Sequence, residues 1–211
     1  MTAFWTLLGP DFAGKSTALA RLHDEHSWRV VSHDDRFLGQ YPLVAMLRRC
    51  WIDAALAWAG KRYTPELVLS VAHSIIPHQR DEVVRLDRKT GPEPVIIDSY
   101  FYKVLAACSL LGVSHERTFS YWRSFPRPMG VVYLDVPPEV TWERAGRGAH
   151  VSAFEHYGDL VSRDGFVRLQ NDMRARMLAE VEDLPLTIVD GTAHPDVVLA
   201  KILSAVGGMP R

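Results

Sequence analysis

Gly9-Pro10-Asp11-Phe12-Ala13-Gly14-Lys15-Ser16-Thr17 matches the phosphate-loop pattern G-x-x-x-x-G-K-[S/T] along its whole length. The apolar residues 4–8 precede this loop and predict a short strand, and residues 16–23 follow it as an expected helix. A strand, the loop and a helix, in that order, are the context in which the pattern carries meaning. These residues therefore decide the fold that we expect.

Phosphate binding explains the layout of this loop. Backbone N–H groups must curl around an anion, and glycines let the chain approach it closely. Lys15 is expected to reach the β- and γ-phosphates of ATP, and Ser16 to place its hydroxyl on Mg²⁺. The positive end of the following helix would face the phosphates. The residues expected to bind the nucleotide are Gly9, Asp11, Phe12, Ala13, Gly14, Lys15, Ser16 and Thr17.

Composition narrows the class of protein. The 211-residue chain has a formal net charge of -1, so no overall basic field points to nucleic acid as a partner. No apolar run approaches the roughly 18 residues of a membrane helix, and the first residues lack the pattern of a signal peptide. Cys50 and Cys108 stand in apolar sequence and are expected to be buried, reduced thiols. We therefore expect a soluble cytoplasmic protein without a membrane partner.

Short apolar runs alternate with helical segments along the chain. Such alternation is typical of a parallel sheet with right-handed crossovers. We predict an α/β protein with the three-layer fold of P-loop NTPases, a five-stranded parallel sheet and a short lid. Residues 1–211 are expected to form a single domain. The expected strands are residues 4–8, 27–32, 95–98, 131–136 and 186–190.

Carboxylates follow two of these strands. Asp34 and Asp35 come after the second strand, and Asp98 ends the third. Ligands of open α/β sheets bind at the carboxyl ends of the strands, so these side chains are expected near the phosphate loop. Asp98 is a candidate Mg²⁺ ligand beside Ser16, and Asp34 or Asp35 is a candidate to bind or deprotonate a substrate hydroxyl. Capping a helix or a turn is the alternative role.

Arg144 and Arg147 fall in a segment punctuated by glycines, which we expect to act as a lid near residues 144–163. Arginine is the residue best suited to stabilise charge on a transferring phosphoryl group. Both arginines are candidates for that role, and Arg163 and Arg168 are further ones. A solvated charged face is the alternative interpretation of each.

Two long helices are expected between the second and third strands. Apolar residues recur at helical spacing over residues 43–60. Trp51 and Trp58 within that stretch are expected to pack in the core rather than to stack on a base. The second helix contains Pro77, which is expected to break or kink it.

Taken together, these motifs resemble the thymidylate kinase family over nearly the whole chain. Residues 95–100 look like that family's strand ending in Asp-Arg-Tyr/His, and residues 134–139 are similar to its Leu-Asp-Val-x-Pro-Glu segment. Phe154-Glu155 looks like the end of its lid. Asp11 stands where the family carries an acidic residue that touches the sugar hydroxyl of a nucleoside monophosphate. The resemblance implies a kinase that uses ATP and Mg²⁺, with the lid arginines acting within one chain or across a homodimer.

Three departures from that family concern the phosphoryl acceptor. Ser99 replaces the arginine of Asp-Arg-Tyr/His, residues 71–76 lack the family's nucleotide-gripping arginine, and residues 33–36 replace Arg-Glu-Pro-Gly-Gly. A phosphate acceptor calls for arginine forks, whereas a hydroxyl acceptor calls for a nearby carboxylate. Two acceptors therefore remain open: a nucleoside monophosphate or related nucleoside, and a hydroxyl of a non-nucleotide small molecule with Asp34 or Asp35 as base.

Two other classes of protein also remain open. A nucleotide-binding regulator without turnover would have little need for an intact Lys15, Ser16 and Asp98 together. A mechanical NTPase would need a partner module or a basic patch, and the sequence offers neither. We therefore favour a kinase of a small molecule. The side chains expected to act in catalysis are Lys15, Asp34, Asp35, Asp98, Arg144 and Arg147.

Overall fold

Five strands form one sheet in the computed structural model, which describes residues 3–59, 63–86, 93–113, 115–152 and 154–207. Every neighbouring pair of strands is parallel, in the order β2-β3-β1-β4-β5. The predicted α/β class and the five-stranded parallel sheet are confirmed. The strands are β1 (Phe4–Leu8), β2 (Arg29–Val31), β3 (Val95–Asp98), β4 (Gly130–Asp135) and β5 (Leu186–Asp190).

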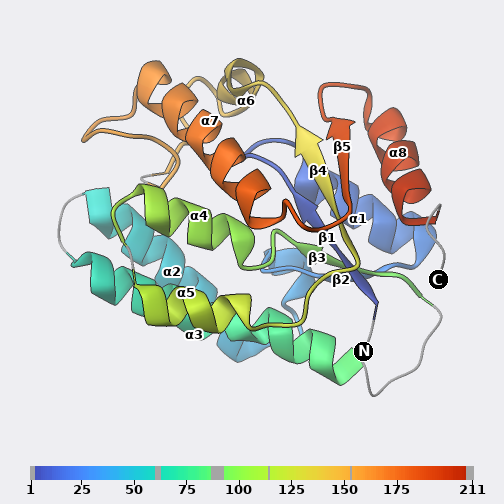
Figure 1. Ribbon diagram of the computed structural model, residues 1–211. Helices are drawn as coiled ribbons and strands as arrows, with labels where there is room; N and C mark the ends of the chain where they lie inside the picture. Colours follow the sequence, from blue (N-terminus) through green and yellow to red (C-terminus); the bar gives the residue numbers. More distant parts are fainter. Residues whose placement is uncertain (1–2, 60–62, 87–92, 114, 153, 208–211) are drawn as a thin grey trace.

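Helices cover both faces of this sheet. They are α1 (Lys15–His26), α2 (Pro42–Ala59), α3 (Pro65–Leu86), α4 (Tyr102–Leu110), α5 (Glu116–Arg123), α6 (Pro138–Arg144), α7 (Arg163–Glu180) and α8 (Pro195–Gly207), with a short 3₁₀ helix η1 (Asp35–Phe37). Figure 1 shows α1 and α8 on one face and α3, α4, α5 and α7 on the other. Within the described residues, no helix has the length and apolar character needed to span a bilayer.

Side chains alternate between the two faces of the sheet along each strand, and helices pack on both faces to give three layers. In β1, Phe4 and Leu8 enter the core beneath α3, α4, α5 and α7, whereas Trp5 and Leu7 enter the core beneath α1 and α8. All of β1 is buried. A strand covered on both faces is apolar throughout, which explains why the sequence shows continuous apolar runs here. The predicted three-layer arrangement is confirmed.

The register of β1 and β3 positions the candidate site. Leu7 pairs with Asp98, and the backbone N–H of Ser99 donates to the carbonyl of Leu7 over 2.9 Å. The phosphate loop leaves β1 two residues after this point. Asp98 and the loop are therefore held side by side at the carboxyl edge of the sheet, where ligands of such sheets bind.

Pro77 does not break the third helix, so of the expected break or kink the break is wrong and the kink stays a prediction. α3 continues from Pro65 to Leu86 with Pro77 inside it. Ala72 and Ile76 before the proline and Val83 after it belong to the same buried cluster. Because packing on both sides of Pro77 fixes the helix to one face, it outweighs the loss of a single backbone hydrogen bond.

The first of the two long helices is less buried than its apolar stripe suggests. Leu43 and Met46 of α2 are exposed, and so is Cys50, whereas Cys108 is buried as expected. α2 packs chiefly against α3, and Leu43 and Met46 of its apolar stripe are left exposed to solvent. The prediction of a buried thiol is wrong for Cys50. The side chain of Trp58 lies outside the described residues.

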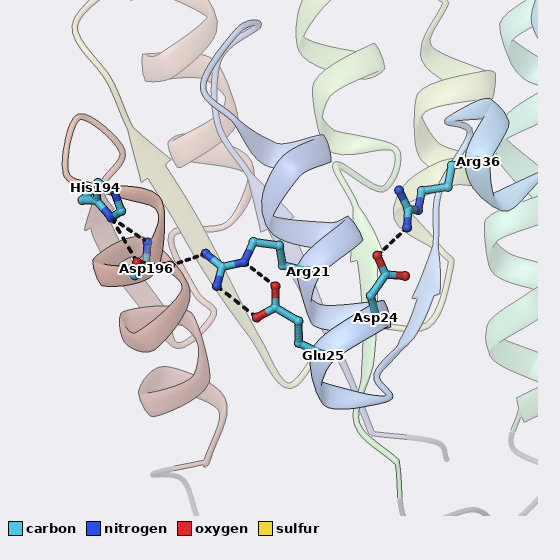
Figure 2. A network of polar contacts seen from close by, with 6 residues as sticks. All are labelled: Arg21, Asp24, Glu25, Arg36, His194 and Asp196. Atoms are coloured by element: carbon cyan, nitrogen blue, oxygen red, sulfur yellow. Dashed lines mark hydrogen bonds and ion pairs between the residues drawn. The ribbon is translucent and has the colours of Figure 1, made fainter.

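Ion pairs tie the outer side of α1 to neighbouring elements, as Figure 2 shows. Arg21 lies 2.7 Å from both Glu25 of its own helix and Asp196 of α8. Farther along the surface, Arg36 pairs with Asp24 of α1. Exposed pairs of this kind add little stability. Their relevance here is that Arg36 is engaged on the outer surface, away from the phosphate loop.

The expected lid follows α6. Residues 145–152 and 154–162 contain turns and bends but neither helix nor strand. Gly146, Arg147 and Gly148 all have positive φ, at 64°, 54° and 98°. An irregular connection of this length is typical of a segment that covers a site. Its movement stays a prediction.

Replacing Gly9 by alanine is expected to destabilise the protein. A Cβ at Gly9 would lie 2.7 Å from the carbonyl oxygen of Leu134 in β4, and the residue has φ +148°. We expect Gly9→Ala to lower the free energy of unfolding by about 1–3 kcal/mol, as measured by urea denaturation. Gly39→Ala is the control, because nothing lies within 4 Å of its Cβ position. Equal stability of the two variants would contradict the close approach of the loop to β4.

Candidate active site

The phosphate loop is folded around its own lysine. Lys15 begins α1 and is buried. Its Nζ donates to the carbonyl oxygens of Gly9, over 2.9 Å, and Pro10, over 2.7 Å. Burial, with a further contribution from the nearby charge of Lys103, lowers the pKa of Lys15 to about 8. The ammonium group that the sequence predicts to bind phosphate thus lies within the loop. It donates to two carbonyl oxygens, whose place phosphate oxygens would take.

A cavity of about 330 Å³ opens beside the loop. It brings Ser16 of the loop together with Asp34 and Asp98, which follow different strands. Apolar side chains from α2 and α3 form much of its wall. The lining residues are Ser16, His33, Asp34, Arg48, Trp51, Ile52, Ala72, Ile75, Ile76, Asp98 and Val104.

Asp98 is held rigidly at the end of β3. The hydroxyl of Ser32 donates to its Oδ2 and that of Ser99 to its Oδ1, each over 2.9 Å. Gln79 of α3 donates to its backbone carbonyl over 3.0 Å. A carboxylate has about four acceptor positions, so two remain for a further ligand. The Asp98 carboxylate and the Ser16 hydroxyl line one cavity and are the hard oxygen donors that Mg²⁺ prefers. The two residues fit the predicted metal.

The two neighbouring aspartates are placed differently. Asp34 lines the cavity, while its Oδ1 also accepts the backbone N–H of Arg36 and so caps η1. Asp35 forms an ion pair with Arg48 at 2.9 Å, and 70% of its side chain is exposed. The geometry therefore favours Asp34 over Asp35 as the side chain that meets an acceptor. The capping role that the sequence left open is real for Asp34, and it engages only one carboxylate oxygen.

The two lid arginines, Arg144 and Arg147, differ in the groups that they contact. Arg144 donates to the carbonyls of Phe12 in the phosphate loop, over 3.3 Å, and Gly191, over 3.1 Å. Arg147 pairs with Glu143 at 2.7 Å, with 76% of its side chain exposed. Arg144 therefore touches the loop in this conformation and Arg147 does not. The assignment of either arginine to a phosphoryl group stays a prediction.

Trp51 and His33 also line this cavity. The ring of Trp51 stacks on Phe154 of the lid, with centroids 5.0 Å apart and planes 9° apart. His33 lines the same cavity, and its buried Nε2 has no hydrogen-bond partner among the described residues. Burial, followed by its neighbour His78, lowers the pKa of His33 to about 3, so the imidazole is neutral at physiological pH. Trp51 packs against the core, as expected, and also lines the cavity.

A second cavity, of about 390 Å³, lies at the β2 edge of the sheet. His78, which lies 5.7 Å from His33 between ring centroids, belongs to its lining. Among the described residues, its lining includes no member of the phosphate loop. Of these two cavities, the first therefore borders the phosphate loop, through Ser16.

A charged cluster joins the loop, α4 and the lid. Lys103 of α4 forms an ion pair with Asp11 of the loop. Burial works against the charged form of Asp11, but Lys103 and then Lys15 outweigh it and lower the pKa of Asp11. Glu155 accepts the backbone N–H of Ser152 over 2.7 Å. Burial, and then the charge of Asp11, raises the pKa of Glu155 to about 7. Sequence reasoning missed Lys103, because its partner is 92 residues away.

Comparison with known proteins identifies the fold. No family profile and no curated protein matches the chain. A solved structure of deoxyadenosine kinase from M. mycoides, with the products dCMP and a flexible dCDP bound, has a TM-score of 0.65 at 12% identity. It covers 97% of this chain and 99% of that one. A dATP-bound structure of that enzyme has a TM-score of 0.57 at 14% identity, covering 96% and 98%. At such low identity the likeness shows the shared fold.

The raised pKa of Glu155 predicts a pH-dependent stability. Between its ordinary value of 4.5 and about 7, the folded chain holds a proton that the unfolded chain releases. Stability therefore falls as pH rises through this window, and the ionised carboxylate opposes folding above it. We expect Glu155→Gln to melt at a higher temperature than the natural chain at pH 8, with little difference at pH 4.5.

Thermal melting followed by circular dichroism at the two pH values measures this effect. A gain of about 2–4 °C at pH 8 would correspond to about 1 kcal/mol for a chain of this size. Asp159→Asn, which makes the corresponding change at an exposed carboxylate of the same segment, is the control. A gain for Glu155→Gln that is the same at both pH values would contradict the prediction.

Proposed function

We propose that this protein is a P-loop kinase that transfers the γ-phosphoryl group of ATP to a hydroxyl of a nucleoside. The observation that supports it best is the cavity in which Ser16 of the phosphate loop and the carboxylate of Asp34 lie on a common wall. A donor phosphate held by the loop and an acceptor hydroxyl bound at Asp34 would meet there. Deoxyadenosine kinases, whose fold the chain shares, add support for a nucleoside as acceptor.

The shape and polarity of the cavity suit such an acceptor. Trp51 offers an aromatic face, and the aliphatic side chains of Ile75 and Ile76 offer an apolar wall. Flat, partly apolar molecules with a few polar edges fit surfaces of this kind. The neutral imidazole of His33 would provide hydrogen bonding without a charge. A nucleoside combines these features with a free hydroxyl group.

In the proposed transfer, each bond that forms is matched by a bond that breaks. A lone pair of the acceptor oxygen forms a bond to the γ-phosphorus, and the bond from that phosphorus to the β–γ bridging oxygen breaks. The electron pair of the broken bond leaves on ADP. The hydroxyl proton passes to the carboxylate of Asp34 and from there to solvent. Lys15 and the loop amides would hold the donor, so catalysis would rest on positioning and electrostatic stabilisation.

Mg²⁺ belongs to this proposal as the partner of the triphosphate. Ser16 and Asp98 would hold it, directly or through water, and it would neutralise charge on the phosphate oxygens. The serine hydroxyls around Asp98 keep its carboxylate oriented for that task. Because both Asp98 oxygens accept only one protein hydrogen bond each, the carboxylate keeps capacity for the ion.

A nucleoside monophosphate is the second candidate acceptor. Arg48 lines the cavity, and its partner Asp35 is mostly exposed. An exposed ion pair is weak enough for a phosphate to replace the carboxylate. This candidate agrees with the resemblance to thymidylate kinases. Arg48 is the specific feature that favours it.

A phosphoryl-transfer screen distinguishes these candidates. The purified chain is incubated with ATP and Mg²⁺ against nucleosides, nucleoside monophosphates and hydroxylated metabolites, and ADP formation is measured. We expect a nucleoside to react fastest and Lys15→Ala to lose about a hundredfold or more of the rate, because a positioned cation on the phosphates is removed. Fastest transfer to a monophosphate would support the second candidate. Transfer to none of the three classes would contradict a kinase.

Paired aspartate variants test the proposed base. We expect Asp34→Asn to lower kcat for the nucleoside by about a hundredfold or more, since a general base contributes about that much. Asp35→Asn is the matched comparison, because the same change is made one residue away on a side chain that faces Arg48 and solvent. Its loss should be at least about tenfold smaller than that of Asp34→Asn. Equal losses, or a larger loss for Asp35→Asn, would refute the assignment of Asp34.

A further inference from the structure

The stability of the fold does not explain why a lysine stands at position 103. Lys103 lies in the first turn of α4, where the helix dipole disfavours a cation, and that turn contains no acidic residue. Its side chain is only 23% exposed. Its ammonium group lies against Asp11 of the phosphate loop. A lysine placed against a helix dipole and largely removed from water needs an anionic partner nearby.

The surroundings of Lys103 are anionic on several sides. Burial acts to lower its pKa, but the carboxylates of Asp11, Glu155 and Asp98 outweigh that effect and raise it. Lys103 is therefore a cation at physiological pH. Asp11 comes from the loop, Glu155 from the lid and Asp98 from the end of β3, so Lys103 lies where these three parts of the site converge.

Lys103 shares its main partner with the phosphate-binding lysine. The charges of both Lys103 and Lys15 act on Asp11. The two ammonium groups are close enough for Lys103 to contribute to the lowered pKa of Lys15. When a triphosphate occupies the loop amides, Lys15 is expected to bind it from within the loop. Lys103 would then lie on the rim of the loop, within reach of the outermost phosphate.

Apart from Lys15, the loop supplies no cation of its own at this point, and Arg144 contacts it only at the backbone carbonyl of Phe12 among the described residues. Phe12 gives it no basic side chain beside Asp11, and Ser99 follows Asp98 in place of an arginine. Arg147 is paired with Glu143 and is mostly exposed. A transferring phosphoryl group carries charge on three equatorial oxygens, and cations near those oxygens stabilise it. Lys103 supplies a cation on a flexible stem with three donors.

We propose that Lys103 binds the γ-phosphoryl group of the bound triphosphate, and that Asp11 holds its ammonium group before the nucleotide enters. This inference rests on the proposed kinase function and adds a residue to it. The ion pair with Asp11 keeps the buried cation neutralised in the free protein. The incoming phosphate oxygens then replace a carboxylate oxygen as its acceptor.

Binding measurements with two nucleotides test this role without turnover. Isothermal titration calorimetry at pH 7.5 with Mg²⁺ gives the affinity of the full chain for ADP and for AMP-PNP, a non-hydrolysable ATP analogue. We expect Lys103→Met to weaken AMP-PNP binding by about tenfold or more, the effect of losing one charge-assisted contact. ADP binding should change by less than about threefold. Lys103→Arg, which keeps the charge, should recover part of the loss.

Asp11→Asn is the matched control for the ion pair. It removes the negative charge of the same ion pair from the loop side and leaves Lys103 in place. If Lys103 served only to anchor α4 to the loop, Lys103→Met and Asp11→Asn would weaken ADP and AMP-PNP binding in the same proportion. That result would overturn the proposal. Selective loss of AMP-PNP affinity in Lys103→Met, but not in Asp11→Asn, supports it. Melting curves confirm that each variant is folded before titration.

The two proposals fail in different ways. A natural chain that binds AMP-PNP, shows the Lys103→Met effect and phosphorylates no acceptor would refute the kinase function and support the role of Lys103. A natural chain that turns over a nucleoside while Lys103→Met binds AMP-PNP normally would refute the role of Lys103 alone. A natural chain that binds neither nucleotide would refute both.

Discussion

The parallel pairing of β1 with β3 is the constraint on which the candidate site depends. Leu7 and Asp98 are register partners, and the N–H of Ser99 closes the pair on the Leu7 carbonyl. A shift of one residue would turn Asp98 toward the opposite face of the sheet, because side chains alternate along a strand. Burial of both strands on both faces prevents such a shift. The distance between the loop and the carboxylate is therefore set by the core.

Charge in the free site is neutralised by the protein itself. Two of the cations donate to backbone carbonyls: Lys15 to those of its own loop, and Arg144 to those of Phe12 and Gly191. The other two face carboxylates, Lys103 that of Asp11 and Arg48 that of Asp35. Each cation thus has a partner that an incoming anion can replace. These cations are already at the site when ligand charge arrives, but each has to exchange its protein partner for the ligand.

Local features of the sequence predicted the fold well. The loop from Gly9 to Thr17 and the apolar strands before and after it depend on neighbours in the chain, and the structure confirms the sheet that they imply. Asp98 could be placed at the sheet edge for the same reason. The continuity of α3 through Pro77 could not be predicted, because the packing on both sides of it involves distant residues.

The charged part of the site depends on tertiary contacts. No spacing in the sequence indicates that Lys103 meets Asp11. Nor does any spacing indicate that Glu155 is buried close enough to Asp11 for its pKa to rise. Asp34 and Asp35 are adjacent in sequence and equivalent as residue types, so only the direction of each side chain separates them. The sequence identifies which residue types can act, and the packing of α2, α4 and the lid decides which of them meet.

The Lys15 side chain turns back into its own loop, and this affects which anions could bind there. Its Nζ donates to the carbonyl oxygens of Gly9 and Pro10. A hydrogen bond from a charged donor contributes about 1.5–3 kcal/mol, so any visitor must compensate for roughly two such bonds. Sulfate or free phosphate offers few contacts beyond the loop, whereas a polyphosphate engages the amides, the lysine and the helix end together. A ligand would therefore have to offer several contacts at once to draw Lys15 away from its two carbonyls.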